Sequence, residues 1–114
     1  MKMFLKTNDK YIDGMNPIEI TLDQALSFVD KHPSDAICDD NFIGFENEHG
    51  QNIQFIKFDD GSWLIDVPIL KNDEYLYSEQ DNDLNLIKVK EIIKLFYKNE
   101  NWRSLCNLTR NEIL

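Results

Sequence analysis

Hydrophobic and polar residues alternate along the middle of the chain, from Phe42 to Leu70, in the pattern of β-strands. Two dipeptides that contain glycine, His49-Gly50 and Asp60-Gly61, interrupt this alternation at a spacing typical of hairpins. Asp-Gly tolerates the positive φ angles that a two-residue type I′ turn requires. We therefore predict three consecutive antiparallel strands that are joined by two-residue turns.

This turn length fixes which residues share a face of the predicted sheet. It places Phe58 opposite Trp63 and Ile43 opposite Ile56, and side chains alternate along each strand. The predicted core face consists of large apolar residues: Ile43, Phe45, Ile56, Phe58, Trp63, Ile65 and Val67. The other face mixes apolar and charged residues: Phe42, Gly44, Glu46, Ile53, Phe55, Lys57, Leu64 and Asp66.

The segment before this meander predicts one strand and one helix. Residues 1–7 alternate as a short strand, and a polar loop follows. Thr21-Leu22-Asp23-Gln24 fits a capping box, in which the Thr and Gln side chains bond to free backbone N–H groups of the first turn. This helix should end near Lys31 or His32, because Pro33 follows.

The segment after the meander predicts a fourth strand over residues 74–80, which Asp81-Asn82-Asp83 would end. A helix should run from about Leu84 to Tyr97, capped by Asp83 or Asn85, with one apolar face. From Trp102 onward we expect a last short element, with a helix favoured. The chain is thus predicted to form a single α+β domain, residues 1–114, in which an antiparallel meander of four to five strands packs against two or three helices.

Charge narrows the expected partners. The formal net charge is −9 at pH 7. Binding to nucleic acids or to anionic membranes requires basic surface, so we expect neither, whereas basic partners would be attracted. The sequence contains neither a signal-peptide pattern nor an apolar run of membrane-spanning length, which predicts a cytoplasmic protein.

The residues that usually carry chemistry are sparse. His32 and His49 lack companions at metal-ligand spacing, and His32 suits a charge partner for the helix C-terminus. Cys38 and Cys106 have the character of small buried hydrophobes. No nucleophile motif or phosphate-binding loop is present. We therefore predict no catalytic residues, no metal and no cofactor.

Acidic residues, in contrast, are predicted to gather. In a meander, alternate connections lie at the same end of the sheet, and the fourth strand returns to that end. This arrangement would bring together six aspartates from three separate stretches: Asp39, Asp40, Asp59, Asp60, Asp81 and Asp83. The alternative explanation is local, because Asp is common in turns and at helix starts, where its carboxylate accepts hydrogen bonds from nearby N–H groups.

The segment FIGFENEHGQNIQFIKFDDGSWLIDVPIL, followed by EIIKLFYKNENWRSL, resembles the small immunity proteins of bacterial polymorphic-toxin and contact-dependent inhibition systems. The similarity lies in the GFEN-type strand, the aromatic-rich meander with a Trp after the hairpin, and the closing NW segment. It covers residues 42–108 approximately. The resemblance implies an acidic α+β protein without catalytic residues that inhibits one toxin, often a nuclease, by direct binding.

We therefore predict an immunity protein that neutralises a basic toxin domain. The six aspartates would meet its Lys and Arg side chains, and Tyr75 and Tyr77 would serve as aromatic anchors. One alternative is a non-enzymatic adaptor that binds a peptide or protein through the mixed sheet face or an edge strand. Another is a small-molecule binder or enzyme with a pocket between sheet and helices. The sequence leaves the oligomeric state open, with a monomer favoured.

Overall fold

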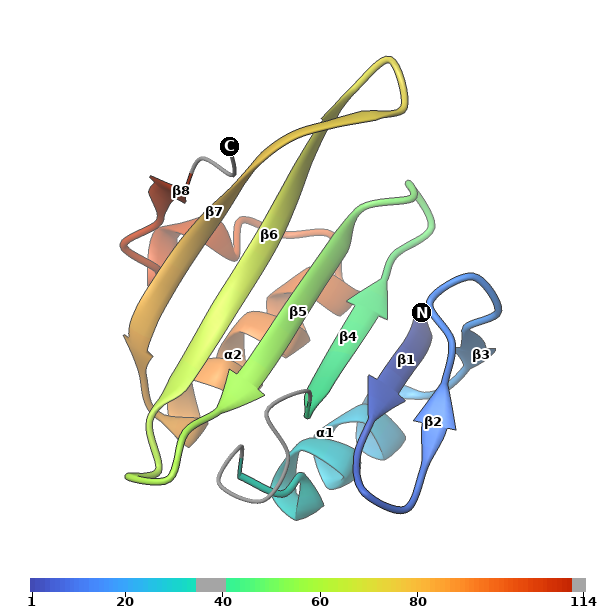
Figure 1. The fold of residues 1–114 in the computed structure, drawn as a ribbon, viewed down its shortest axis with the longest axis vertical. Coiled ribbons are helices and arrows are strands. Elements are labelled where there is room, and N and C mark those ends of the chain that lie inside the picture. Colours follow the sequence, from blue (N-terminus) through green and yellow to red (C-terminus); the bar gives the residue numbers. More distant parts are fainter. Residues whose placement is uncertain (35–40, 112–114) are drawn as a thin grey trace.

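The computed structural model describes residues 1–34 and 41–111, in which one antiparallel sheet carries both α-helices on the same face (Figure 1). The elements in chain order are β1 (Lys2–Lys6), β2 (Tyr11–Ile12), β3 (Ile18–Glu19), α1 (Leu22–Lys31), β4 (Phe42–Glu46), β5 (Asn52–Lys57), β6 (Trp63–Lys71), β7 (Glu74–Leu84), α2 (Leu86–Tyr97), the 3₁₀ helix η1 (Arg103–Leu105) and β8 (Thr109–Asn111). The strand order is β2-β1-β4-β5-β6-β7-β8, and β3 also pairs with β1.

The predicted α+β class is confirmed, but the predicted count of four to five strands was too low. The sheet has eight strands. The additional ones are short: β2 and β3 contain two residues each, and β8 contains three. β8 follows the stretch from Trp102 in which a short helix was favoured and in which the 3₁₀ helix η1 lies. Their sequences are too short to show an alternating pattern, and pairing with β1 or β7 holds them extended.

β1 lies inside the sheet, between β4 and the two short strands. Met3 and Leu5 are buried in the core on the helix-covered face. The Phe4 ring points to the other face, which we call the open face because no helix of the described residues covers it (Figure 1). There the ring lies over Gly44 and leaves no room for a Cβ atom.

Both predicted hairpin turns were wrong by one residue. Phe58 pairs with Ser62 through an N–H to C=O bond of 2.8 Å, so the loop consists of residues 59–61. Gly61 has a φ of 87°, and it is the left-handed residue that closes such a three-residue loop. The Asn47–Gln51 pair and Gly50, with a φ of 75°, repeat the arrangement one hairpin earlier.

The longer turns invert the predicted faces of β5, since a shift of one residue moves every side chain to the opposite face. Ile53 and Phe55 are fully buried under the helices, whereas Ile56 and Phe58 are half-buried. The faces predicted for β4 and β6 are confirmed, with Ile43, Phe45, Trp63, Ile65 and Val67 in the core.

The connection between β6 and β7 is a two-residue turn. Asn72 and Asp73 have φ angles of 53° and 64°, as a type I′ turn requires. β7 then continues to Leu84, so the prediction that it ends at residue 80 was wrong. Asp81-Asn82-Asp83 does not break the strand, because pairing with β6 extends to Trp63–Leu84 across an irregularity in the register.

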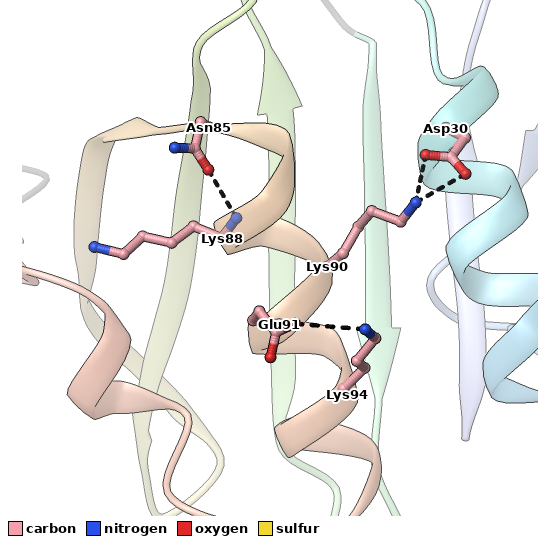
Figure 2. Close-up of polar contacts among 6 residues, drawn as sticks. All are labelled: Asp30, Asn85, Lys88, Lys90, Glu91 and Lys94. Carbon is pink, nitrogen blue, oxygen red and sulfur yellow. Dashed lines mark hydrogen bonds and ion pairs between the residues drawn. The ribbon is translucent and has the colours of Figure 1, made fainter.

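The helices begin at the predicted caps. Thr21 and Gln24 form the complete capping box of α1, with bonds of 3.1 and 2.9 Å. Asn85 caps α2 by accepting a 2.8 Å bond from the Lys88 N–H (Figure 2). Lys90 of α2 bonds both carboxylate oxygens of Asp30 on α1, at 2.8 and 3.0 Å, and ties the two helices together (Figure 2).

Candidate protein interface

We use the name acidic pole for four described aspartates, Asp59, Asp60, Asp81 and Asp83. The first two form the tip of the β5–β6 hairpin, and the last two lie near the C-terminal end of β7. Figure 1 shows this tip and this strand end at the same end of the sheet, where β4 also begins. Asp39 and Asp40, which were predicted to join them, lie outside the described residues.

Two of these carboxylates have local structural roles. Asp60 accepts bonds from the Ser62 hydroxyl at 2.6 Å and from the Ser62 N–H at 2.9 Å, and these bonds lower the pKa of the Asp60 carboxyl. Asp81 accepts bonds from the N–H groups of Asp83 and Asn107, at 3.0 and 2.9 Å. The local explanation for acidic residues therefore accounts for Asp60 and Asp81.

The other two aspartates are available for contact. Asp59 and Asp83 are exposed, and their carboxylates take part in none of the hydrogen bonds or ion pairs found among the described residues. Asp59 stands beside Asp60 on a loop that its own backbone bonds hold in place. The pole thus presents unshielded negative charge at the hairpin tip and at the end of β7.

Basic residues from distant parts of the chain reach the Asp81 side of the pole. Burial first, and then the charge of Asp81, raise the pKa of the Cys106 thiol to about 11, while Lys88 and Arg103 oppose this shift. All three charged groups therefore lie close enough to act on one thiol. The predicted stretches contain no Lys or Arg, and the fold brings these two from α2 and η1.

The two tyrosines predicted as anchors do not lie at the acidic pole. Tyr75 pairs with Leu70 in the β6–β7 hairpin, which projects at the opposite end of the sheet (Figure 1). Tyr77 is half-buried, and the Arg110 guanidinium carbon lies 4.0 Å from its ring centroid. The residues predicted as one binding surface are thus divided between the two ends of the molecule.

The open face holds a hollow that sequence reasoning missed. It has a volume of about 740 Å³ and lies between the β1–β2 hairpin and the strands β4 and β5. Phe42 and Ile56 supply apolar lining, and Asn41, Gln54 and Tyr11 supply polar groups. The Asn41 side-chain oxygen is buried without a hydrogen-bond partner. The only sequence signal was the mixed face, whose β5 residues were assigned wrongly.

The buried histidine has a different role from the predicted one. His32 is only 4% exposed, and its ring centroid lies 5.9 Å from that of Trp63. Burial, aided by the charge of Lys57, lowers the pKa of His32 to about 4. The ring is therefore neutral at pH 7 and is not a charged partner of the α1 dipole. Cys106 is half-buried, and Cys38 lies outside the described residues.

Two further features are absent from the described part of the chain. There, His, Cys, Asp and Glu residues form no group of three or more that could hold a metal ion. Across residues 1–34 and 41–111, neither helix has the length and apolar character needed to cross a membrane. In comparisons with known proteins, no family model, curated protein or solved structure matches this chain.

Proposed function

We propose that this protein is an immunity protein that binds a cognate bacterial toxin domain, with a nuclease as the expected class, and blocks it stoichiometrically. The observation that carries the proposal is the acidic pole, where Asp59 and Asp83 expose carboxylates at one end of the sheet. The net charge of the chain, −9, has the same sign as the pole. A nuclease binds phosphates with Lys and Arg side chains, and ordered carboxylates can occupy the same positions.

The hairpin is suited to this task because it is ordered before binding. The Phe58–Ser62 pair and the Asp60–Ser62 bonds fix the loop, so little conformational entropy is lost when a partner docks. The lowered pKa of Asp60 keeps its carboxylate charged. Charges of this kind accelerate association and orient the partner, and they contribute less to the lifetime of the complex.

The proposal can be tested with the products of the genes that neighbour this one, among which we expect a large secreted protein with a C-terminal toxin domain. The two proteins would be co-expressed, and toxin activity, growth and binding at low and high salt would be measured. The informative variant is Asp59→Lys with Asp83→Lys, because neither carboxylate supports the fold. Glu48→Lys with Glu100→Lys is the matched control, since both residues are exposed and the change in charge is equal.

We expect 1:1 binding and protection of growth by the wild-type protein. The variant of the pole should associate about tenfold or more slowly at low salt, with a smaller difference at high salt, while the control stays near wild type. Absence of binding and of protection would refute the immunity function. Binding that is unaffected by salt and by the variant would refute the role of the pole alone.

The hollow on the open face favours a second candidate, a non-enzymatic adaptor that binds a peptide or protein along that face. Its volume of about 740 Å³ is within the range of ligand sites, and Phe42 and Ile56 offer apolar contact. An Ile56→Lys variant separates the two candidates, because it changes the open face and leaves Asp59 and Asp83 intact. Loss of partner binding in this variant, with the acidic-pole variant unaffected, would favour the adaptor.

A further inference from the structure

The β6–β7 hairpin extends past the strands on both sides of it. β5 pairs with β6 only as far as Gln54–Asp66, and within the described residues β8 pairs with β7 only over Ser78–Gln80. Residues 69–77 therefore form a two-stranded arm, which projects at the end of the sheet opposite the acidic pole (Figure 1). We call this segment the β6–β7 arm.

The turn of the arm and the pairing of its two strands give it a regular backbone. Its type I′ turn at Asn72-Asp73 has the backbone twist that matches paired strands. The register continues through Leu70–Tyr75 to Lys71–Glu74, with an irregularity between Ile69 and Leu70. Such irregularities rotate the strand locally and re-aim its side chains. The arm can thus present defined side chains to a partner.

The side chains that the arm presents are apolar. Leu70 is 53% exposed, Leu76 is 48% exposed and Tyr75 is 47% exposed. Leu70 and Tyr75 are cross-strand partners, and Leu76 follows Tyr75 in β7, beside the irregularity in the register. Large apolar side chains exposed close together mark interaction sites more often than scattered single residues do. Tyr is also among the residues that most often dominate binding energy, because it offers large area with few rotatable bonds.

A hollow of about 260 Å³ adjoins the base of the arm. Pro68, Ile69 and Leu70 form one wall, and Trp102 and Arg103 form another. Asn52 also lines it, and the side-chain oxygen of Asn52 is buried without a hydrogen-bond partner. The arm and this hollow together offer an apolar projection beside a recess of mixed polarity that contains an unsatisfied acceptor, which suits contact with a structured protein.

The charge of the β6–β7 arm and of the whole chain indicates which kind of partner could bind the arm. The tip of the arm carries Asp73 and Glu74 against a single basic residue, Lys71, on a chain with net charge −9. An anionic membrane, a nucleic acid and a second copy of this chain would all be repelled. The remaining occupant is a protein cleft that is apolar inside and basic at its rim. The active-site cleft of a phosphate-binding enzyme combines these two properties.

We propose that the β6–β7 arm inserts into an apolar, basic-rimmed cleft of the toxin domain and is the anchor of the complex, with Tyr75 at its centre. This inference rests on the proposed function and adds the contact that sets the lifetime of the complex. The acidic pole then governs the rate of association, and the arm governs the rate of dissociation.

The test compares two pairs of exposed apolar residues. Tyr75→Ser with Leu76→Ser alters the arm, and Tyr97→Ser with Ile87→Ser alters α2, where Tyr97 is also 47% exposed. Dissociation constants and dissociation rates with the purified toxin domain would be measured, with circular dichroism as the check on folding. We expect the arm variant to bind about thirtyfold or more weakly, through faster dissociation, and the α2 variant to stay within about threefold of wild type.

The outcomes separate the two proposals. Failure of the wild-type protein to bind the toxin domain would overturn both. Tight wild-type binding with equal affinities for the arm and α2 variants would overturn the role of the arm and leave the immunity function standing. If the arm variant does not fold, hydrogen exchange of the wild-type complex decides: slowed exchange of the amides in residues 69–77 supports insertion, and unchanged exchange overturns it.

Discussion

The two hairpins at opposite ends of the sheet differ in what supports them and in what they expose. The β5–β6 hairpin lies between β4 and β7, and its inner residues Phe55 and Trp63 are buried under the helices. The β6–β7 arm, in contrast, has no paired strand on either side among the described residues. β5 pairs with β6 only as far as Asp66, and β8 pairs with β7 only from Ser78 onward. The first hairpin exposes aspartates at its tip, and the second exposes Leu70, Tyr75 and Leu76.

This contrast indicates a division of roles within one sheet. A hairpin that is fastened to the core can carry like charges on its tip, because burial of its inner residues offsets their repulsion. The base of the arm touches the core through Ile69, but Leu70, Tyr75 and Leu76 are not among the described residues that pack against it. These three exposed apolar residues therefore contribute little to folding and remain available to a partner. The charge of the acidic pole would steer the partner during association, and the apolar area of the β6–β7 arm would anchor the complex once it has formed.

The largest expected effect is a difference between the two hairpins in how much a substitution lowers the free energy of unfolding. Phe55→Ala should lower the free energy of unfolding by about 3–5 kcal/mol, because it leaves a cavity in the closed core. Leu70→Ala on the arm should cost less than about 1 kcal/mol, since Leu70 is already half in solvent. Urea denaturation monitored by circular dichroism measures both. Similar losses in the two variants would mean that the arm is part of the folded core.

Acidification should lower the free energy of unfolding through His32, which contacts Trp63 of the β5–β6 hairpin. His32 lies beside Trp63 with a pKa lowered from 6.5 to about 4, so the unfolded chain binds a proton in a pH range where the folded protein does not. The stability from the neutral ring is complete above pH 6.5 and falls as the pH decreases toward 4. The loss should amount to about 2–3 kcal/mol over this range.

Unfolding free energies measured between pH 4 and pH 7 test this dependence. The variant His32→Leu removes the titrating ring and should flatten the curve in that range. Protection factors of the arm amides, in which the intrinsic pH dependence of exchange is removed, should change with pH only through global unfolding, because the arm lies at the other end of the sheet. A wild-type curve as flat as that of the variant would contradict a neutral buried His32.

The turns allow a finer comparison. Gly61→Ala should cost about 1 kcal/mol, because its φ of 87° is unfavourable for any residue with a Cβ atom, although no atom lies within 4 Å of the added Cβ. Asn72→Gly in the arm should change stability by less than about 0.5 kcal/mol, since glycine accepts the same positive φ. Thermal melts of the two variants measure the difference. Equal melting temperatures would show that the loop at residues 59–61 relaxes.

The sequence predicted those parts of the fold that depend on local chemistry. The capping box at Thr21 and Gln24 and the Asn85 cap need only neighbouring residues, and both were found. The apolar alternation of β4 and β6 identified their buried faces. Turn length could not be predicted in this way, because Asp-Gly fits both two-residue and three-residue loops. The Phe58–Ser62 pair decides between them, and it depends on the whole sheet.

The candidate surfaces were predicted less completely, for a related reason. The connectivity of a meander correctly placed Asp59 and Asp83 at the same end of the sheet (Figure 1). It could not show that Lys88 and Arg103 would act on the same thiol as Asp81, because they come from elements outside the sheet. It also could not show that Tyr75 lies on an arm, since the arm exists only where β5 and β8 stop pairing.

The smallest expected effect lies within the acidic pole and compares two adjacent aspartates. Asp60 accepts two bonds from Ser62, and its lowered pKa means that the folded protein favours the charged form. Asp60→Ala should therefore lower the melting temperature slightly at pH 7, and this difference from wild type should shrink as the pH falls and the wild-type carboxylate becomes protonated. Asp59→Ala serves as the control, because the Asp59 carboxylate accepts neither of the bonds from Ser62. In toxin binding, we expect Asp59→Ala to have the larger effect and Asp60→Ala the smaller. The Asp59 carboxylate is free for a partner, whereas the Asp60 carboxylate already accepts the bonds that hold the loop. Equal effects of the two substitutions on stability and on association would mean that the pole acts through total charge alone, without the ordered loop.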